Sequence, residues 1–148
     1  MPSLANAADR RAIESRFGRL ASDTKGLWGV MTAPQMLAHC ADSLRMALGD
    51  LPVKRKNIAL FRHFPLKHLV IYVLPFPKSA PTAPELKART PRPFDDEGAD
   101  IRALLARLDP ATGSTRAKEH PIFGSMTPEQ WGALGYRHLD HHLRQFGV

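Results

Sequence analysis

Three histidines gather near the carboxyl end of the chain, at His138, His141 and His142. Residues 127–146 (TPEQWGALGYRHLDHHLRQF) have the pattern of one helix, which completes a turn about every 3.6 residues. His138 and His142 are therefore one turn apart on one face, with Cβ atoms about 5–6 Å apart. Two imidazoles in this register can bind one metal ion, each nitrogen at about 2.0–2.1 Å if the ion is zinc. The spacing predicts a metal site that needs a third ligand from elsewhere.

His39 is the candidate for that third ligand. It lies in the middle of a predicted helix among apolar neighbours, where an unpartnered histidine is costly to bury. The pair on the last helix continues an apolar stripe and is expected to face the core; the stripe consists of Trp131, Leu134, His138, His142 and Gln145. If the two helices face each other, three imidazoles can hold one divalent ion and leave a position for water or substrate. Ordinary core or surface histidines are the alternative.

The other histidines are weaker candidates. His141 lies about 60° around the helix from the first histidine of the pair, and is expected to be a neighbour of the site or an exposed residue. His120 begins a short loop before the last helix, where a structural role is favoured over a hydrogen bond near the site. His63 and His68 are expected to be ordinary polar positions. Asp140 is predicted to lie on the opposite face from the pair, so it is not expected to be a ligand.

The elements that must position these side chains are helices. Periodic apolar residues predict helices over residues 8–20, 32–48, 95–108 and 127–146, and a further helix, bent or broken at Pro65, over residues 58–74. The β-branched run 70–73 leaves a strand as the alternative within the last of these. Thr32 with Gln35, and Thr127 with Gln130, have the spacing of a capping box, and Gly49 is expected to end the second helix. Both helices that carry candidate ligands thus have defined starts.

A proline-rich stretch separates the third and fourth predicted helices. Residues 75–93 contain six prolines, which predicts a long loop that covers a pocket mouth or packs against a partner subunit. With no sheet expected, the 148 residues are predicted to form one all-α domain. Its architecture is expected to be a four-helix bundle with this long loop between helices 3 and 4.

The composition is that of an ordinary globular domain, with 43% hydrophobic and 24% charged residues. No stretch of about 20 apolar residues is present, so neither a membrane span nor a membrane partner is expected. The amino-terminal residues lack the apolar core of a secretion signal. Cys40 is the only cysteine, which excludes an internal disulfide, fits a reducing cytoplasm and indicates a buried thiol.

The net charge of +7 and the isoelectric point near 10.1 raise the question of nucleic acid. The densest basic cluster, at residues 54–56, has no zinc-finger spacing, aromatic RNA-binding motif or helix-turn-helix pattern beside it. A solvated basic surface is therefore favoured over a nucleic-acid groove. A non-catalytic basic helical module that binds nucleic acid or an acidic protein stays open as the alternative function.

Two blocks of the sequence carry a family resemblance. Residues 28–49 (WGVMTAPQMLAHCADSLRMALG) and 120–147 (HPIFGSMTPEQWGALGYRHLDHHLRQFG) are similar to the DinB-like superfamily, whose members are four-helix bundles. The resemblance implies a metal held by one histidine on the second helix and a His-x-x-x-His pair on the last, which correspond to His39, His138 and His142. It also implies a divalent ion (nickel, zinc, iron or manganese) and a homodimer. The proline-rich middle of the chain is outside the resemblance.

The resemblance also implies a kind of chemistry. Members of the superfamily include thiol-dependent S-transferases and a mycothiol-dependent isomerase, in which the metal activates the thiol of a small cofactor. A metal-dependent transferase or hydrolase with a small-molecule thiol partner is thus expected. The sequence shows no evident general base, and His141 and His120 are the available candidates.

A second apolar side of the last helix, formed by Tyr136, Leu139 and Leu143, is expected to face the core or a partner subunit.

Overall fold

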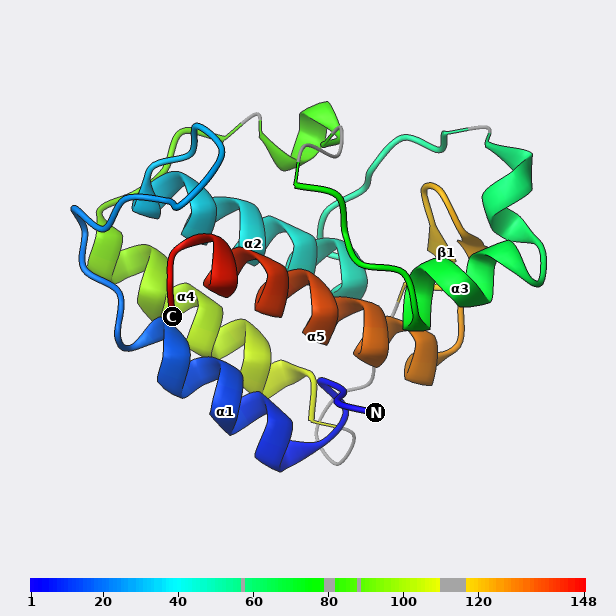
Figure 1. The fold of residues 1–148 in the computed structure, drawn as a ribbon, viewed down its shortest axis with the longest axis horizontal. Coiled ribbons are helices and arrows are strands. Elements are labelled where there is room, and N and C mark those ends of the chain that lie inside the picture. The colour runs from blue at the N-terminus through cyan, green and yellow to red at the C-terminus, as the bar shows by residue number, and fades with distance from the viewer. Residues whose placement is uncertain (57, 79–81, 88, 110–116) are drawn as a thin grey trace.

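Helices dominate the part of the chain that the computed structural model describes, which is residues 1–56, 58–78, 82–87, 89–109 and 117–148 (Figure 1). The α-helices are α1 (Ala7–Phe17), α2 (Ala33–Leu48), α3 (Leu66–Tyr72), α4 (Phe94–Arg107) and α5 (Pro128–Gln145). Two short 3-10 helices, η1 (Ala59–Arg62) and η2 (Pro84–Leu86), and a two-stranded antiparallel hairpin, β1 (Glu119–His120) with β2 (Gly124–Ser125), complete the elements. The all-α prediction is confirmed. Among the described helices, none has the length and apolar character to cross a membrane.

The two helices that carry the candidate ligands begin as predicted. Thr32 Oγ1 accepts the backbone N–H of Gln35, whose side-chain oxygen accepts the backbone N–H of Thr32 at 2.9 Å. Thr127 and Gln130 repeat this capping box at the start of α5. Each box satisfies two of the N–H groups that a helix start leaves free, which fixes the first turn. Gly49 then ends α2 in the left-handed conformation, at φ 80°.

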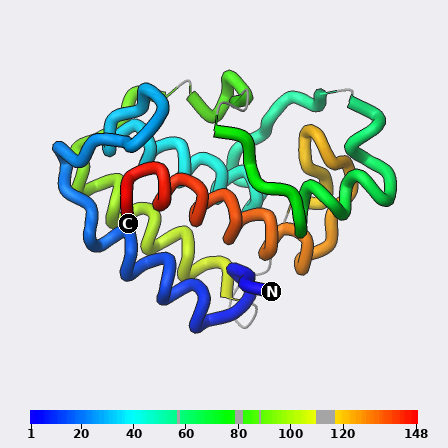
Figure 2. Tube along the Cα trace, viewed as in Figure 1, coloured from blue at the N-terminus to red at the C-terminus, as the bar shows by residue number. Residues whose placement is uncertain are grey.

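Four of the helices pack around one hydrophobic core (Figures 1 and 2). α2 lies against both α4 and α5, and α1 also contacts both of these helices. Leu139 and Leu143, on the second apolar side of α5, are fully buried in this core. This side of α5 therefore faces the core, and a partner subunit cannot cover these two leucines.

The segment predicted as a helix bent or broken at Pro65 is broken there into two short helices. η1 and α3 are separated by the cis peptide bond between Phe64 and Pro65, and the strand alternative is wrong. Ile71 of α3 is fully buried in a second, smaller hydrophobic cluster next to Trp131 of α5. The guanidinium group of Arg137 on α5 donates to the carbonyls of Val70 and Ile71, at 2.8 and 2.6 Å. It thereby satisfies carbonyls that the end of α3 would leave free.

The proline-rich loop before α4 differs in part from the prediction. It contains η2, which no periodic pattern indicated, and its residues 79–81 and 88 lie outside the described part of the chain. The hairpin over residues 119–125 was also not expected, because two-residue strands are too short to show an alternating pattern. Elsewhere the predicted helix ends differ from the observed ones by a few residues; α1, for example, ends at Phe17.

Candidate metal centre

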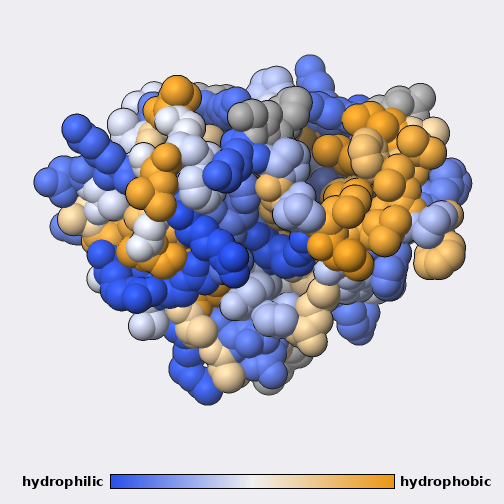
Figure 3. Space-filling view, in the orientation of Figure 1, coloured by the Kyte–Doolittle hydropathy of each residue, from blue (hydrophilic) through white to orange (hydrophobic). Residues whose placement is uncertain are grey.

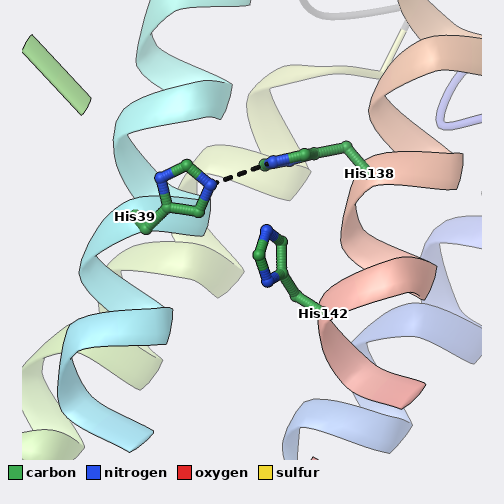
Figure 4. A group of neighbouring side chains, drawn as sticks. All are labelled: His39, His138 and His142. Atoms are coloured by element: carbon green, nitrogen blue, oxygen red, sulfur yellow. Dashed lines mark hydrogen bonds between the residues drawn. The ribbon is translucent and has the colours of Figure 1, made fainter. Parts of the chain in front are cut away.

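The structure brings the three predicted ligands together between α2 and α5 (Figure 4). His39 projects from α2, and His138 and His142 project from α5 toward it. The Nε2 atoms of His39 and His138 are 3.0 Å apart, and one ring nitrogen from each histidine lies within 4.8 Å of the other two. Two nitrogens that are each about 2.0–2.1 Å from one zinc ion lie about 3 Å apart or slightly more. The arrangement is thus of the right size to hold an ion.

His39 is oriented by the proline-rich loop. Its Nδ1 lies 3.2 Å from the backbone carbonyl oxygen of Leu86, at the end of η2. A carbonyl oxygen can only accept a hydrogen bond, so the ring proton of His39 is on Nδ1. The Nε2 atom, which faces His138, consequently presents a lone pair.

His142 is oriented by the loop that precedes α2. Its Nδ1 is 2.8 Å from Gln145 Oε1, while Gln145 Nε2 donates to the carbonyl of Trp28 at 2.8 Å. Because the Trp28 carbonyl must receive the amide N–H, the amide oxygen faces His142 and accepts its Nδ1–H. Gly29 makes room for this amide: it has φ 79°, and a Cβ atom there would lie 2.5 Å from Gln145 Nε2. Again Nε2 is left with a lone pair.

His138 is oriented by Ser43, one turn after His39 on α2. The Ser43 hydroxyl donates to the carbonyl of Cys40 at 2.7 Å, and its oxygen is 3.2 Å from His138 Nδ1. Since the hydroxyl proton is used on Cys40, the oxygen accepts the Nδ1–H of His138. In all three rings the proton is on Nδ1, held by a partner outside the cluster, as is usual for histidines that bind metals.

The electrostatics of the cluster favour neutral rings. Burial lowers the pKa of His39, lowers that of His138 well below its usual value, and lowers that of His142 to about 4. Neutral imidazole is the form that binds a metal ion. With the ring protons on Nδ1, the dashed contact of Figure 4 brings lone pairs of His39 and His138 face to face across 3.0 Å. A cation between the rings would satisfy both, so the donor set fits a divalent metal ion.

A buried ionic network anchors the loop segment that holds His39. The Arg89 guanidinium donates to both carboxylate oxygens of Glu97 on α4, and also lies 3.3 Å from an oxygen of Asp42 on α2. Glu97 is fully buried and also accepts the backbone N–H of Arg92 at 2.8 Å. Burial alone would raise the pKa of Glu97, but the hydrogen bonds from Arg89 and Arg92 lower it to about 2. The carboxylate thus stays ionised and ties the loop to both helices.

A cavity of about 270 Å³ lies beside His39. Its lining combines apolar side chains with two cations and one carboxylate; besides His39 it includes Val30, Met31, Asp42, Lys87, Arg89 and Pro91. On another side of the cluster, His141 is half-buried next to the rings of Trp28 and Phe76, each with its centroid 5.9 Å away. His141 is therefore a neighbour of the cluster and not a member of it, as predicted.

The remaining predicted positions have structural roles. His120 Nδ1 accepts the backbone N–H groups of Ile122 and Phe123, at 3.1 and 3.3 Å, and thereby closes the hairpin turn. His63 and His68 lie on the η1–α3 segment, outside the cluster. Cys40 is fully buried, and burial raises the pKa of its thiol, so it does not supply a reactive thiolate.

Asp140 faces away from the cluster. Its carboxylate pairs with Arg16 of α1 at 2.7 Å and with Arg144 at 2.9 Å. As predicted, it does not contribute to the histidine cluster.

A comparison with models of protein families shows to which family the chain belongs. The model of the DinB superfamily matches residues 10–146. The chain belongs to the DinB superfamily. Comparisons with curated proteins and with solved structures found no match. The matched region includes α2 and α5 with all three histidines, so membership in the DinB superfamily and the geometry of the cluster are both compatible with metal binding.

Proposed function

We propose that this DinB superfamily protein binds one divalent metal ion through the Nε2 atoms of His39, His138 and His142. The observation that carries the proposal is the set of three converging Nε2 lone pairs, each ring having its proton held elsewhere. Nickel, zinc, iron and manganese are the expected ions. Imidazole nitrogens accept several first-row metals, and affinity order alone does not select among them in the cell.

We further propose that the protein is a metal-dependent enzyme, a thiol S-transferase or a related transferase or hydrolase. Three protein ligands are typical of sites that keep a position open for chemistry. A bound ion would lower the pKa of a thiol or water that binds at that position. The thiol must come from a small molecule, because Cys40 is buried within α2. A cavity lies beside His39 and Leu86, but neither His138 nor His142 lines it.

A homodimer and a cytoplasmic location are also proposed. The homodimer follows from the family resemblance, and the cytoplasmic location from the single cysteine. The mass of the purified protein in solution, measured over a range of concentrations, tests the dimer.

Metal analysis tests the site directly. Protein purified without a histidine tag and reconstituted with each candidate ion is expected to hold one equivalent per chain. His39→Ala, His138→Ala and His142→Ala are each expected to lose it, whereas His63→Ala, at an exposed position outside the cluster, serves as the matched control. A wild-type protein that stays well below one equivalent with every ion would contradict the proposal.

The second candidate function is a non-catalytic basic module that binds nucleic acid or an acidic protein. The observation that favours it is the net charge of +7, with a dense cluster at residues 54–56. Nucleic-acid binding of this kind weakens steeply as salt is added. The absence of any shift with duplex or single-stranded DNA at low salt would remove the nucleic-acid version.

A further inference from the structure

The η1–α3 segment exposes a group of large apolar side chains, here called the η1–α3 patch: Ile58, Leu60, Phe64, Leu69, Val73 and Leu74. Phe64 is 83% exposed and Leu60 is 69% exposed. Figure 3 shows a broad hydrophobic area over this part of the molecule. Single exposed apolar residues are ordinary, but a contiguous group of this kind marks an interaction surface.

The stretch of chain that contains this segment, residues 51–84, holds nearly all of the net charge. Residues 51–84 contain no Asp or Glu, but six Lys or Arg residues: Lys54, Arg55, Lys56, Arg62, Lys67 and Lys78. Because the whole chain has a net charge of +7, the rest of the sequence is almost balanced. Two acidic groups approach from outside the segment: Glu85 accepts the backbone N–H of Lys54, and Glu129 lies close enough to Tyr72 to raise its pKa further after burial. The apolar patch therefore belongs to a strongly basic stretch of the chain, although Lys78 of that stretch lies over the ring of Trp28 in the loop before α2.

The patch is built on a fixed support. Beneath it, Ile71 is fully buried and the Arg137 guanidinium holds the carbonyls at the end of α3. The Lys67 ammonium donates to the carbonyl of Ser125 in the hairpin, and Arg62 packs against Gly124. The patch thus exists before any partner arrives, so that binding need not order this segment.

The charge argues against a second copy of the chain as the occupant. In a symmetric dimer the same surface lies on both sides of the interface. Two copies paired through this patch would bring together two basic stretches, residues 51–84 of each chain, with six positive charges and no carboxylate in each stretch. A concave acidic protein surface would match the charge, but Phe64 and Leu60 protrude and would each need a fitted hollow. A lipid surface accepts protruding apolar side chains without such a fit.

We propose that the η1–α3 patch docks this protein on an anionic lipid surface. Phe64, Leu60 and Val73 enter the boundary between headgroups and acyl chains, while exposed cations next to the segment in sequence, Lys54 and Arg55, reach the lipid phosphates. Positive charge attracts the segment to an anionic leaflet, and the apolar side chains retain it there. The sequence predicted no membrane partner because it has no apolar stretch long enough to cross a membrane. Docking on a lipid surface does not need such a stretch. The inference is independent of the metal site.

Vesicle sedimentation tests the proposal with the full chain. Binding is expected to vesicles of phosphatidylcholine and phosphatidylserine at a ratio of about 2:1, to weaken with added salt, and to be absent with phosphatidylcholine alone. The double variant Leu60→Ser/Phe64→Ser is expected to weaken binding by about tenfold or more. The matched control is Leu27→Ser/Val30→Ser, because these side chains are 71% and 97% exposed but lie in the loop before α2. Both variants alter exposed side chains, and circular dichroism checks that each is folded.

Several outcomes would overturn the proposal. One is the absence of binding to anionic vesicles, and another is binding that both double variants reduce equally. A third is a dimer in solution that Leu60→Ser/Phe64→Ser abolishes, which would show that a second copy covers the patch. A fourth is a Lys54→Glu/Arg55→Glu variant that no longer binds DNA but binds vesicles as the wild type does. This result would show that these basic residues serve nucleic-acid binding and not lipid binding. Metal content measured on the same samples distinguishes each of these from a failure of the metal site.

Discussion

The Nε2 atoms of His39 and His138 lie 3.0 Å apart, and the hydrogen bonds of both rings place their protons on the far nitrogens. Two lone pairs at this distance repel each other, and burial disfavours the extra proton that would join them. A cation between the two rings would relieve this repulsion. The orientations of the three rings come from contacts on three sides of the cluster, at Leu86, Ser43 and Gln145.

Metal removal is expected to lower the stability of the fold. An ion that binds only the folded protein stabilises it by about 2.7 kcal/mol when its free concentration is 100 times the dissociation constant. Thermal unfolding of wild-type protein should thus shift upward on metal addition and return on chelation. His39→Asn is expected to abolish this shift. His63→Asn is the control and should keep it. A metal-dependent shift that persists in His39→Asn would contradict the assignment of His39.

The loop at Gly29 is expected to control metal affinity through Gln145. Gly29→Ala would strain a backbone at φ 79° and place a Cβ atom 2.5 Å from Gln145 Nε2. Displacement of Gln145 frees the His142 ring, and loss of such an outer hydrogen bond typically costs about 10–100-fold in metal affinity. Titration with a competing chelator measures this loss.

Gly147→Ala is the matched control for that experiment. Gly147 has φ 77°, but the nearest atom to its added Cβ is a Leu27 carbon at 3.8 Å, so the substitution strains the backbone without displacing Gln145. Equal losses of metal affinity in both variants would show that backbone strain, and not the position of Gln145, is responsible. Gln145→Ala should reproduce the effect of Gly29→Ala.

Local patterns account for what the sequence predicted. The capping boxes at Thr32 and Thr127 and the spacing of His138 and His142 each depend on residues within one turn of one helix. The pairing of His39 with the last helix needed only that the two helices be neighbours. Local rules therefore sufficed to predict that α2 and α5 form, and which of their histidines are candidates.

The groups that orient the rings could not be predicted in this way. Leu86 is 47 residues from His39, and Trp28 is 117 residues from Gln145. Leu86 also acts through its backbone carbonyl, which leaves no signature in its side chain. Arg89 and Glu97 were missed for a related reason, since only the folded loop shows that they meet beside α2. Gln145 and Ser43 shared faces with the ligands, which was the one signal available.

The metal-free protein is expected to lose stability as the pH falls from about 6.5 to about 4. His142 and His120 both have pKa values lowered to about 4 by burial, against an ordinary value of 6.5. Between these values the unfolded chain binds protons that the folded chain does not, so the free energy of unfolding falls as the pH falls. Each histidine contributes on the order of 2–3 kcal/mol over this window. Urea unfolding with chelator present, from pH 7 to pH 4, measures the slope.

His120 offers a way to separate the two contributions. His120→Asn removes one titrating group outside the cluster and should reduce the slope, while added metal should affect only the part that comes from the cluster. A free energy of unfolding that is flat between pH 6.5 and pH 4 in the metal-free wild type would contradict the inferred neutral rings.

The ionic network behind the loop is expected to support both the fold and the site. Glu97→Gln keeps the shape of a fully buried side chain but leaves Arg89 with Asp42 as its one remaining ionic partner among the described residues. Removing one partner of a buried pair costs about 3–5 kcal/mol, and the partial exposure of Arg89 reduces this to about 1–3 kcal/mol. Because the same loop presents the Leu86 carbonyl to His39, metal affinity should fall as well.

The control is Asp50→Asn, which breaks an exposed ion pair with Arg107 and should cost about 0–1 kcal/mol with no change in metal affinity. Normal metal binding in a destabilised Glu97→Gln protein would show that the network supports the fold without positioning His39.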